Sequence, residues 1–263
     1  MDKSTFQKEF LGFEEPLKSY LYRLCTNMQD AEDLCQDAYL KAFEKLDQFK
    51  EESSLKTWVF KIASNLALDN FRVQKRWGED WMDKVKDVHV ANPSLMAKKM
   101  EVQQSSEYGT FVISEHINYC FNCTSKTLPL IGQLCLWLKE VYEFKISEIC
   151  SILELGEGKV KHALADARKD MIRIFEKRCA LINKKGICSQ CTGLNQIYNP
   201  KQDAQVEANK LKLHRERDLK NYEELLDLRM AIVKSLDPLQ EQGRDLHNYL
   251  LENSPNWAEN FAQ

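Results

Sequence analysis

Six side chains of this 263-residue sequence have the types and the spacing of metal ligands. They are His116, Cys120, Cys123, Cys179, Cys188 and Cys191. The first three are spaced i, i+4 and i+7, so a helix would place them on one face, and the last two form a second Cys-x-x-Cys pair. Two Cys-x-x-Cys pairs can hold zinc in a tetrahedral thiolate site. We therefore expect the two pairs as ligands, with His116 and Cys179 as alternates.

Whether these cysteines bind metal depends on where the protein works. The amino terminus has no apolar signal region, and no stretch of about 18 apolar residues occurs. We therefore expect a cytoplasmic protein that does not span a membrane, in which cysteines are rarely paired as disulfides. The six candidates can then form a zinc or redox site, or they can be reduced structural thiols. No cofactor is required by the sequence, and a thioredoxin-like enzyme would need a βαβ context that is missing.

The other cysteines have a simpler interpretation. Cys25, Cys35, Cys135 and Cys150 fall at apolar positions of helical patterns. We expect them to be core thiols, because a free cysteine behaves as a small apolar side chain.

Charge is distributed unevenly along the first part of the chain. The net charge is only −3, so no global polycation is available to hold nucleic acid non-specifically. Residues 1–49 carry ten acids against six bases, whereas residues 50–76 carry six bases against three acids. An acidic surface followed by a basic one suits a protein contact followed by a nucleic-acid contact.

Helical periodicity predicts an acidic helix that begins near residue 30. Asp30 is its expected N-cap, and Glu32 and Asp33 in the opening turn oppose the helix dipole. The apolar positions that follow keep the three-to-four rhythm of a buried stripe. They are Leu34, Ala38, Ala42, Phe43 and Leu46.

A polar loop and a second helix follow the acidic helix. The loop covers residues 49–54, and Ser53 or Ser54 is the expected cap of the second helix. This helix is expected to bury Trp58, Ile62 and Leu66, and to end in basic residues. Those residues are Arg72, Lys75 and Arg76.

The remaining pattern predicts an all-α fold, since helical periodicity dominates and Gly and Pro are scarce. The expected segments are a helical domain at 8–77, with a first helix from Phe10 to Leu24, a linker at 78–109, a helical domain at 110–178 and a cysteine-containing helical extension at 179–263. The extension has a break at Asp237-Pro238. It is expected to dock within the protein, with partner binding as the alternative.

Within 110–178 the pattern predicts a helix-turn-helix. Thr127 is expected to cap a helix with Pro129 in its first turn, and Ser147 to cap a short helix that ends before a turn at Leu155-Gly156. The next helix is expected from about Glu157 to Lys177.

The order of these parts resembles the first conserved domain of bacterial sigma factors of the extracytoplasmic-function group, within the sigma-70 superfamily. That family has an AEDL-x-Q helix, an F-x-x-x-S-S-x-x-T-W loop and an I-A-x-N-x-x-x-D-x-x-R helix. The matching residues are Ala31, Glu32, Asp33, Leu34 and Gln36, then Phe49, Ser53, Ser54, Thr57 and Trp58, then Ile62, Ala63, Asn65, Asp69 and Arg72.

The helix-turn-helix is similar to the second conserved sigma domain. The matches are Glu148, Ile149, Leu153, Val160, Lys161, Leu164, Ala167 and Arg168. Ala163 and Asp166 stand where many relatives carry arginine, which removes phosphate or base contacts and implies weaker or different promoter reading.

The resemblance implies three binding surfaces. Capture of a flipped base of the −10 element, with backbone contacts beside it, would use Lys50, Ser53, Ser54, Lys56, Lys61, Asn65, Asp69, Asn70, Arg72, Lys75 and Arg76. Reading of the −35 element would use Gly158, Lys159, Lys161, His162, Arg168 and Lys169. Docking on the clamp helices of the largest polymerase subunit would use Asp33, Leu34, Gln36, Asp37 and Tyr39. For Trp58, a core position is favoured over a stacking platform.

The resemblance also implies the partners. A protein of this kind is not an enzyme, and it binds core RNA polymerase, promoter DNA and an anti-sigma factor, but no membrane. The alternative is a free-standing helix-turn-helix regulator, or a thiol or metal sensor, that acts without polymerase. The acidic helix with Asp33 and Gln36 favours the sigma factor, because a free regulator has no use for it.

Overall fold

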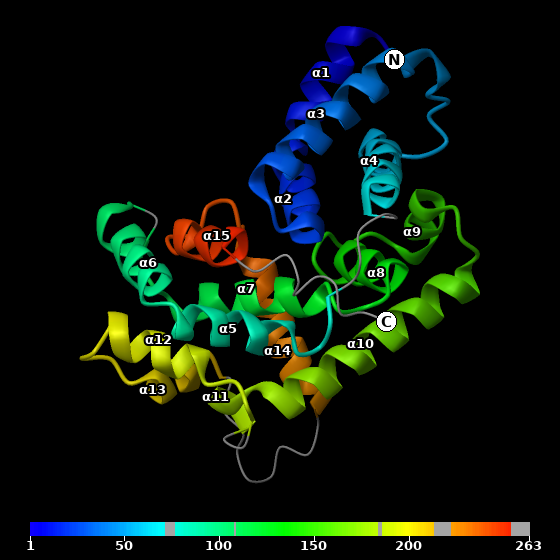
Figure 1. The fold of residues 1–263 in the computed structure, drawn as a ribbon. Helices are drawn as coiled ribbons and strands as arrows, with labels where there is room; N and C mark the ends of the chain where they lie inside the picture. Colours follow the sequence, from blue (N-terminus) through cyan, green and yellow to red (C-terminus); the bar gives the residue numbers. More distant parts are fainter. Residues whose placement is uncertain (72–76, 108, 184–185, 213–221, 254–263) are drawn as a thin grey trace. The chain divides into compact units, whose positions relative to one another are not determined.

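The structure is a computed structural model that describes residues 1–71, 77–107, 109–183, 186–212 and 222–253. Within these ranges every regular element is a helix, apart from an isolated bridge between Cys179 and Cys188 (Figure 1). The all-α prediction is therefore confirmed. No helix in the described part of the chain has the length and apolar character needed to cross a membrane.

The chain divides into two compact units whose boundaries differ from the expected segments. Unit 1 comprises Met1–Lys75 and Pro129–Ala167, and unit 2 comprises Arg76–Leu128 and Arg168–Gln263. The segment 110–178, expected to form one domain, is thus shared between the two units.

Unit 1 is built around two aromatic side chains. Its helices are α1 (Lys3–Leu11), α2 (Glu14–Cys25), α3 (Met28–Glu44), the 3-10 helix η1 (Leu46–Gln48), α4 (Leu55–Phe71), α8 (Leu130–Glu140), α9 (Ile146–Leu153) and the first part of α10 (Glu157–Arg178). Tyr20 and Phe60 are fully buried with ring centroids 5.3 Å apart, and the Tyr20 hydroxyl lies 2.9 Å from the Ser64 hydroxyl. Phe60 also packs 4.9 Å from Phe144, so one core joins α2 and α4 to the segment before α9.

The single helix expected from Phe10 to Leu24 is two helices. α1 ends at Leu11 and α2 begins at Glu14, because the backbone at Phe13 leaves the helical region with φ −136° and ψ 11°. Asp2 caps α1 by accepting the N–H groups of Ser4 and Thr5. The break lets α1 lie against α3 as well as α2.

The predicted cap of α3 was wrong, whereas that of α4 is confirmed. The Asn27 side chain caps α3 by accepting the Asp30 N–H at 3.0 Å. In α4, the Ser54 hydroxyl accepts the Thr57 N–H at 3.1 Å. Both are the side-chain caps that a helix start favours.

The buried stripes were predicted better for α3 than for α4. The buried residues of α3 include Leu34, Ala38 and Ala42, as expected, and Phe43 is half-buried. The buried residues of α4 are Leu55, Thr57, Val59, Phe60, Ala63, Ser64, Ala67 and Phe71. Trp58, Ile62 and Leu66 are only half-buried, so the expected stripe lay one position off.

The helix-turn-helix segment has the expected elements with different caps. Pro129, not Thr127, holds the N-cap position of α8. Lys145, not Ser147, holds that of α9, where the Glu148 carboxylate accepts the Lys145 N–H at 2.8 Å. α9 ends at Leu153, with Glu154 in the left-handed region (φ 54°), and α10 begins at Glu157 as expected.

Unit 2 includes the segment that was expected to be a linker. Its helices are α5 (Trp81–Ala91), α6 (Pro93–Ser105), α7 (Ile113–Ser125), the end of α10, α11 (Ala180–Asn183), α12 (Gln190–Tyr198), α13 (Ala204–Lys210), α14 (Tyr222–Ser235) and α15 (Arg244–Glu252). Trp77 and Trp81 are buried and stack 3.6 Å apart, and Arg178 donates twice to Asp83 at 2.7 Å. The linker prediction was wrong. The segment has so many charged residues that its few buried apolar positions do not stand out as a helical pattern in the sequence.

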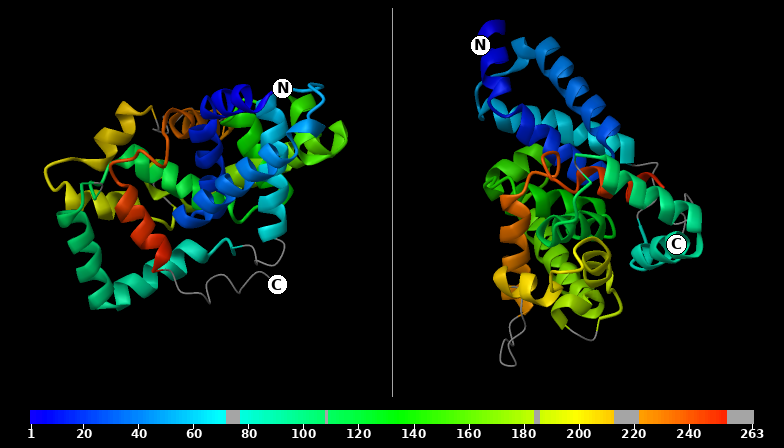
Figure 2. Two further views of the ribbon diagram at one scale, coloured as in Figure 1. Left: turned by 90° about the horizontal axis from the view of Figure 1, so that it is seen from above. Right: turned by 90° about the vertical axis from the view of Figure 1, so that its left-hand side faces the viewer.

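The carboxyl-terminal extension packs within unit 2, as expected. α14 lies against α7, and α15 lies beside α6, as the left view of Figure 2 shows. The buried residues Leu225, Leu246 and Leu250 belong to the same apolar core as Trp81 and Phe111.

Candidate functional site

The acidic face of α3 is open to a partner. Asp33, Gln36 and Asp37 are exposed, as a docking face requires. Leu40 follows them on the same face with 45% of its surface exposed, and sequence reasoning missed it. Leu34 is buried with 6% exposure, so its expected partner contact is replaced by packing inside unit 1.

Tyr39, the fifth residue expected to dock, is held by aromatic neighbours. Its ring centroid lies 4.9 Å from that of Phe10 and 5.6 Å from that of Phe6. Its hydroxyl accepts a hydrogen bond from Gln7 Nε2 at 3.3 Å. The half-buried ring is thus fixed at the wall of a hollow rather than projecting into solvent.

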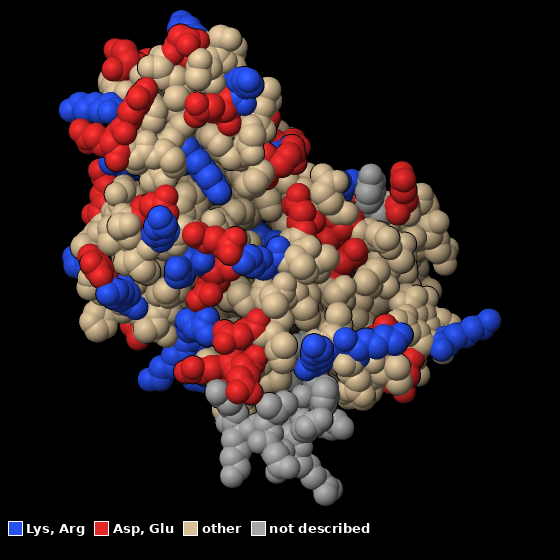
Figure 3. Space-filling model, turned by 180° about the vertical axis from the view of Figure 1, so that it is seen from behind, with Lys and Arg blue, Asp and Glu red and all other residues tan. Residues whose placement is uncertain are grey.

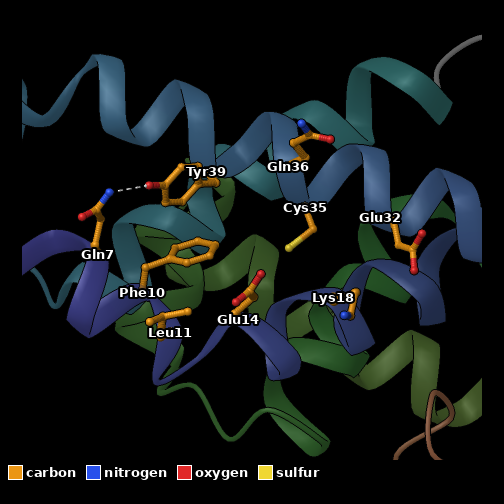
Figure 4. A pocket seen from close by; sticks show the side chains of 9 residues that line it. All are labelled: Gln7, Phe10, Leu11, Glu14, Lys18, Glu32, Cys35, Gln36 and Tyr39. Carbon is orange, nitrogen blue, oxygen red and sulfur yellow. Dashed lines mark hydrogen bonds between the residues drawn. The ribbon is translucent and has the colours of Figure 1, made fainter.

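That hollow, the docking groove, lies between α1, α2 and α3 and measures about 530 Å³ (Figure 4). Its lining residues are Gln7, Phe10, Leu11, Glu14, Lys18, Glu32, Cys35, Gln36 and Tyr39. Leu11 is 69% exposed, and Glu14 and Glu32 add two carboxylates. Burial, and then the charge of Glu14, raise the pKa of Cys35 to about 11. An exposed leucine beside carboxylates suits a partner surface that is apolar and basic.

A second hollow, the loop pocket, lies at the polar loop before α4 and measures about 480 Å³. Its lining residues are Gln48, Phe49, Lys50, Glu52, Ser53, Thr57, Trp58, Lys61, Cys150, Ser151 and Glu154. Trp58 is half-buried, and its ring centroid lies 5.1 Å from that of Phe49. The core position favoured for Trp58 is therefore only partly correct. Because a half-exposed indole can stack on a base, the pocket offers such a platform.

Helix α9 forms one wall of the loop pocket. Lys61 Nζ lies 2.8 Å from Glu154 Oε1, and the Thr57 hydroxyl donates to Glu148 Oε1 at 3.2 Å. The two helices are side by side in Figures 1 and 2. Sequence reasoning missed Glu154 as a neighbour of the loop, because 93 residues separate it from Lys61 and nothing local reports that contact.

The other residues expected at the −10 element have varied surroundings. Lys56 lies over the rings of Phe60 and Phe144, 5.7 and 5.0 Å from their centroids, so its charge is directed to the core. Asn65 is half-buried, whereas Lys50, Ser53, Asp69 and Asn70 are exposed. Arg72, Lys75 and Arg76 lie outside the described residues.

The residues expected to read a −35 element occupy α10. In unit 1, Gly158, Lys159, Lys161 and His162 are exposed, and Lys161 pairs with Glu157 at 2.5 Å. In unit 2, Lys169 is exposed, whereas Arg168 donates to Asp227 of α14 at 2.6 Å. That contact occupies a guanidinium expected to face DNA. Acidic and basic side chains are interspersed over the face shown in Figure 3, with no broad basic area.

The expected metal ligands all lie in unit 2. Cys123 belongs to one apolar core, Cys120, Cys179 and Cys191 pack against that core, and Cys188 bridges Cys179 through the backbone. Burial, and then the neighbouring thiols, raise the pKa values of Cys120 and Cys191. Among the described residues no group of three or more His, Cys, Asp or Glu has the arrangement of a metal site. Thiolate chemistry fits zinc, but the side chains would have to turn toward a common centre.

His116 and Cys123 are both buried. His116 Nδ1 lies 3.3 Å from His247 Nε2, and burial followed by the charge of His247 lowers the pKa of His116 well below its usual range. Burial raises the pKa of Cys123 to about 12. Cys25, Cys35 and Cys135 are buried as expected, whereas Cys150 is half-buried at the loop pocket.

Comparison with known proteins shows which proteins this chain resembles. Residues 12–76 match the family model described as Sigma-70 region 2. The chain is 25% identical over 169 residues to the ECF RNA polymerase sigma factor SigW of Bacillus subtilis, covering 64% of this chain and 87% of that protein. It is 24% identical over 183 residues to the ECF RNA polymerase sigma-E factor of Escherichia coli, covering 70% and 87%.

Two further similarities were found. A probable RNA polymerase sigma factor of Haemophilus influenzae is 29% identical over 171 residues, covering 59% of this chain and 82% of that protein. Among solved structures, the sigma factor RpoE of Bartonella quintana, in complex with the anti-sigma factor NepR, aligns with a TM-score of 0.46 and 21% identity, covering 65% of this chain and 97% of that one.

Proposed function

This chain belongs to the extracytoplasmic-function group of the sigma-70 family. We propose that it binds polymerase through α3 and the docking groove, and promoter DNA through the loop pocket and α10. The chain directs RNA polymerase at transcription initiation and is not itself an enzyme. The free-standing regulator considered from the sequence is thereby set aside. We place its action in the cytoplasm, with the polymerase and the promoter. An anti-sigma partner stays a prediction.

The docking surface is the exposed face of α3 with the docking groove beside it. Asp33, Gln36 and Asp37 present polar groups, and Leu40 and Leu11 present exposed apolar surface. Protein interfaces combine apolar and polar groups in this way. The carboxylates steer a basic partner surface, which we take to be the clamp helices of the largest polymerase subunit. The open face of α3 is the observation that carries the proposal.

The loop pocket is the site for one base of the −10 element. Its volume of about 480 Å³ falls in the range of pockets that hold small molecules. Trp58 supplies a stacking surface, Ser53 a hydroxyl and Lys50 a phosphate contact. Flipping a base costs a few kcal/mol. Opening a bubble of about ten base pairs costs on the order of 14 kcal/mol, so the rest must come from the polymerase.

In unit 1 the loop pocket is closed on one side by α9. We propose that α9 separates from α4 when the chain joins polymerase and DNA, because Lys61 is otherwise held by Glu154. The exposed residues of α10, which are Gly158, Lys159, Lys161 and His162, then read the −35 element. Arg168 contributes only if it leaves Asp227.

The docking proposal is tested by co-purification with core polymerase. Asp33→Arg should abolish retention of the chain, because a like charge against a basic surface costs several kcal/mol. Glu101→Arg, at an exposed position of α6 in unit 2, is the matched control and should be retained like the wild type. Equal retention of all three proteins would refute docking through α3.

A further inference from the structure

Unit 2 contains a cavity to which the proposed function assigns no role. It measures about 170 Å³ and lies between α5, α6, α7, α12 and α15. Its walls are apolar at Val85, Met96, Leu194 and Leu250. At its mouth Val90 and Ile197 are 66% and 48% exposed. It lies outside the region that matches the family model, residues 12–76.

Two buried polar side chains line this cavity, and neither forms a hydrogen bond or an ion pair among the residues that the structure describes. His89 is 3% exposed, and neither of its ring nitrogens has a hydrogen-bond partner there. Lys99 is 6% exposed, and no carboxylate of the described chain pairs with its ammonium. Its Nζ makes a cation–π contact with the ring of Tyr198, whose centroid lies 5.9 Å away.

Such groups are expensive to bury. Burial lowers the pKa of Lys99, and burial with the nearby Lys99 charge lowers that of His89. A buried ammonium without a counter-ion, and an imidazole without a hydrogen bond, each destabilise the folded state. The groups therefore mark a place where an external partner would supply the missing interactions.

The charged residues around the cavity indicate that its ligand is an anion. No Asp or Glu is among its lining residues, whereas Lys86 adds a second cation to Lys99. The first turn of α12 also lines it, through Ser189, Gln190 and Gly193. A helix N-terminus favours an anion. A Cβ added at Gly193 would meet nothing within 4 Å, so the cavity comes close to the α12 backbone there.

We propose that this cavity binds a small monocarboxylate with an apolar body, its carboxylate held by Lys99 and His89. The size agrees, since a cavity of about 150 Å³ accepts one benzene ring. Lys99 is the one ammonium buried at the cavity and matches one negative charge, and the apolar walls suit an apolar body rather than the further charged oxygens of a phosphate. The apolar body replaces water against Met96, Leu194 and Leu250.

The site would give this sigma factor a ligand response of its own. The ligand would contact α5, α6, α12 and α15 at once, so it would stabilise unit 2 by linkage. The inference does not depend on the docking and promoter surfaces, and its test does not involve polymerase or DNA.

The test is calorimetric titration of the full chain with benzoate, phenylacetate and hexanoate. At least one should bind saturably and raise the melting temperature, whereas benzyl alcohol and inorganic phosphate should not. Lys99→Met should weaken the binding by about tenfold or more, since a charge-assisted hydrogen bond contributes about 1.5–3 kcal/mol. Gly193→Leu should block it by filling the mouth.

Lys98→Met is the matched control, because Lys98 is the exposed neighbour of Lys99 on α6. It should bind like the wild type. Lys99→Met should stay folded, because an apolar side chain of similar length suits the buried position. Absence of saturable binding with all three carboxylates, or equal binding by Lys99→Met and the wild type, would overturn the proposal. Equally tight binding of phosphate would also overturn it.

Discussion

Lys61 on α4 and Glu154 at the end of α9 form an ion pair, with 2.8 Å between Nζ and Oε1. Both side chains line the loop pocket. The pair therefore links the loop proposed to capture a −10 base to the helix-turn-helix proposed to read the −35 element. Under the proposed function, this contact joins the two DNA-binding elements in the free protein and is released when the chain binds DNA.

Removing the Glu154 charge should favour binding of the −10 strand. The pair is partly exposed, with 36% and 63% of the side-chain surfaces accessible, so it contributes at most about 1 kcal/mol. Glu154→Gln should therefore tighten binding of a single-stranded −10 oligonucleotide by up to about fivefold, measured by fluorescence anisotropy. Glu101→Gln removes an exposed acid from unit 2 and should have no effect. Weaker binding by Glu154→Gln would contradict the closed pocket.

Two residues of the loop pocket are predicted to have different roles: Ser53 contacts a base and Lys50 contacts the phosphate backbone. Ser53→Ala should change which −10 sequence is preferred, because the hydroxyl is exposed at the pocket. Lys50→Ala should weaken binding of all sequences alike and reduce the salt slope by about 0.7, the value for one phosphate contact on single strands. Anisotropy titrations over a salt series distinguish the two. A switch of sequence preference in Lys50→Ala would reverse these assignments.

The stability of unit 2 should fall in acid because of His116. Its pKa in the folded protein lies well below the usual 6.5, so the unfolded chain binds the proton more readily. Stability from this group is fully present above about 6.5 and is lost as the pH falls toward the folded value, by at most about 1.4 kcal/mol per pH unit. His116→Gln should flatten the pH dependence of the unfolding free energy between pH 7 and 5, as urea titrations would measure.

The control for this effect is His162→Gln, which changes an exposed histidine of α10. It should keep the wild-type pH dependence. If His116→Gln and the wild type gave the same slope, the buried imidazole would not be the source of the acid sensitivity.

Zinc binding stays a prediction, now narrowed to the cysteines that lie together. Protein purified under reducing conditions should hold one zinc ion per chain by metal analysis. Cys120→Ser and Cys191→Ser should lose it, and so should the wild type in acid, because thiolates release metal on protonation. Cys150→Ser is the control and should keep its zinc. Less than about a tenth of an equivalent in folded, active wild type would leave structural thiols as the explanation.

The sequence predicted local features well where a motif and a period coincide. The helices around residues 30–71, the Ser54 cap and the start of α10 at Glu157 all follow from capping residues and apolar spacing. The prediction of a cap was wrong where two candidates lie close together, as Asn27 and Asp30 do. Both residue types are favoured N-caps, so the local sequence does not distinguish them. The α4 stripe failed by one position because Trp58 is large and apolar yet lies at the loop pocket.

Long-range features could not be predicted from local patterns. The packing of Trp77 and Trp81 in unit 2 turns an expected linker into part of a core. Lys61 pairs with Glu154, and Arg168 pairs with Asp227. The partners are distant in sequence, so neither helical periodicity nor capping residues could predict these contacts. The unpartnered state of His89 is likewise a property of the fold rather than of its neighbours in the chain.

Run-off transcription with core polymerase is the most direct test of the central claim, that the open face of α3 brings this chain to the polymerase. Wild-type chain added to core enzyme should start RNA synthesis at a cognate promoter. Asp33→Arg should abolish the product at any concentration that saturates the wild type, and Glu101→Arg should give full yield. Undiminished transcription by Asp33→Arg, or tight specific binding of the isolated chain to duplex promoter without any polymerase-dependent transcript, would contradict the account.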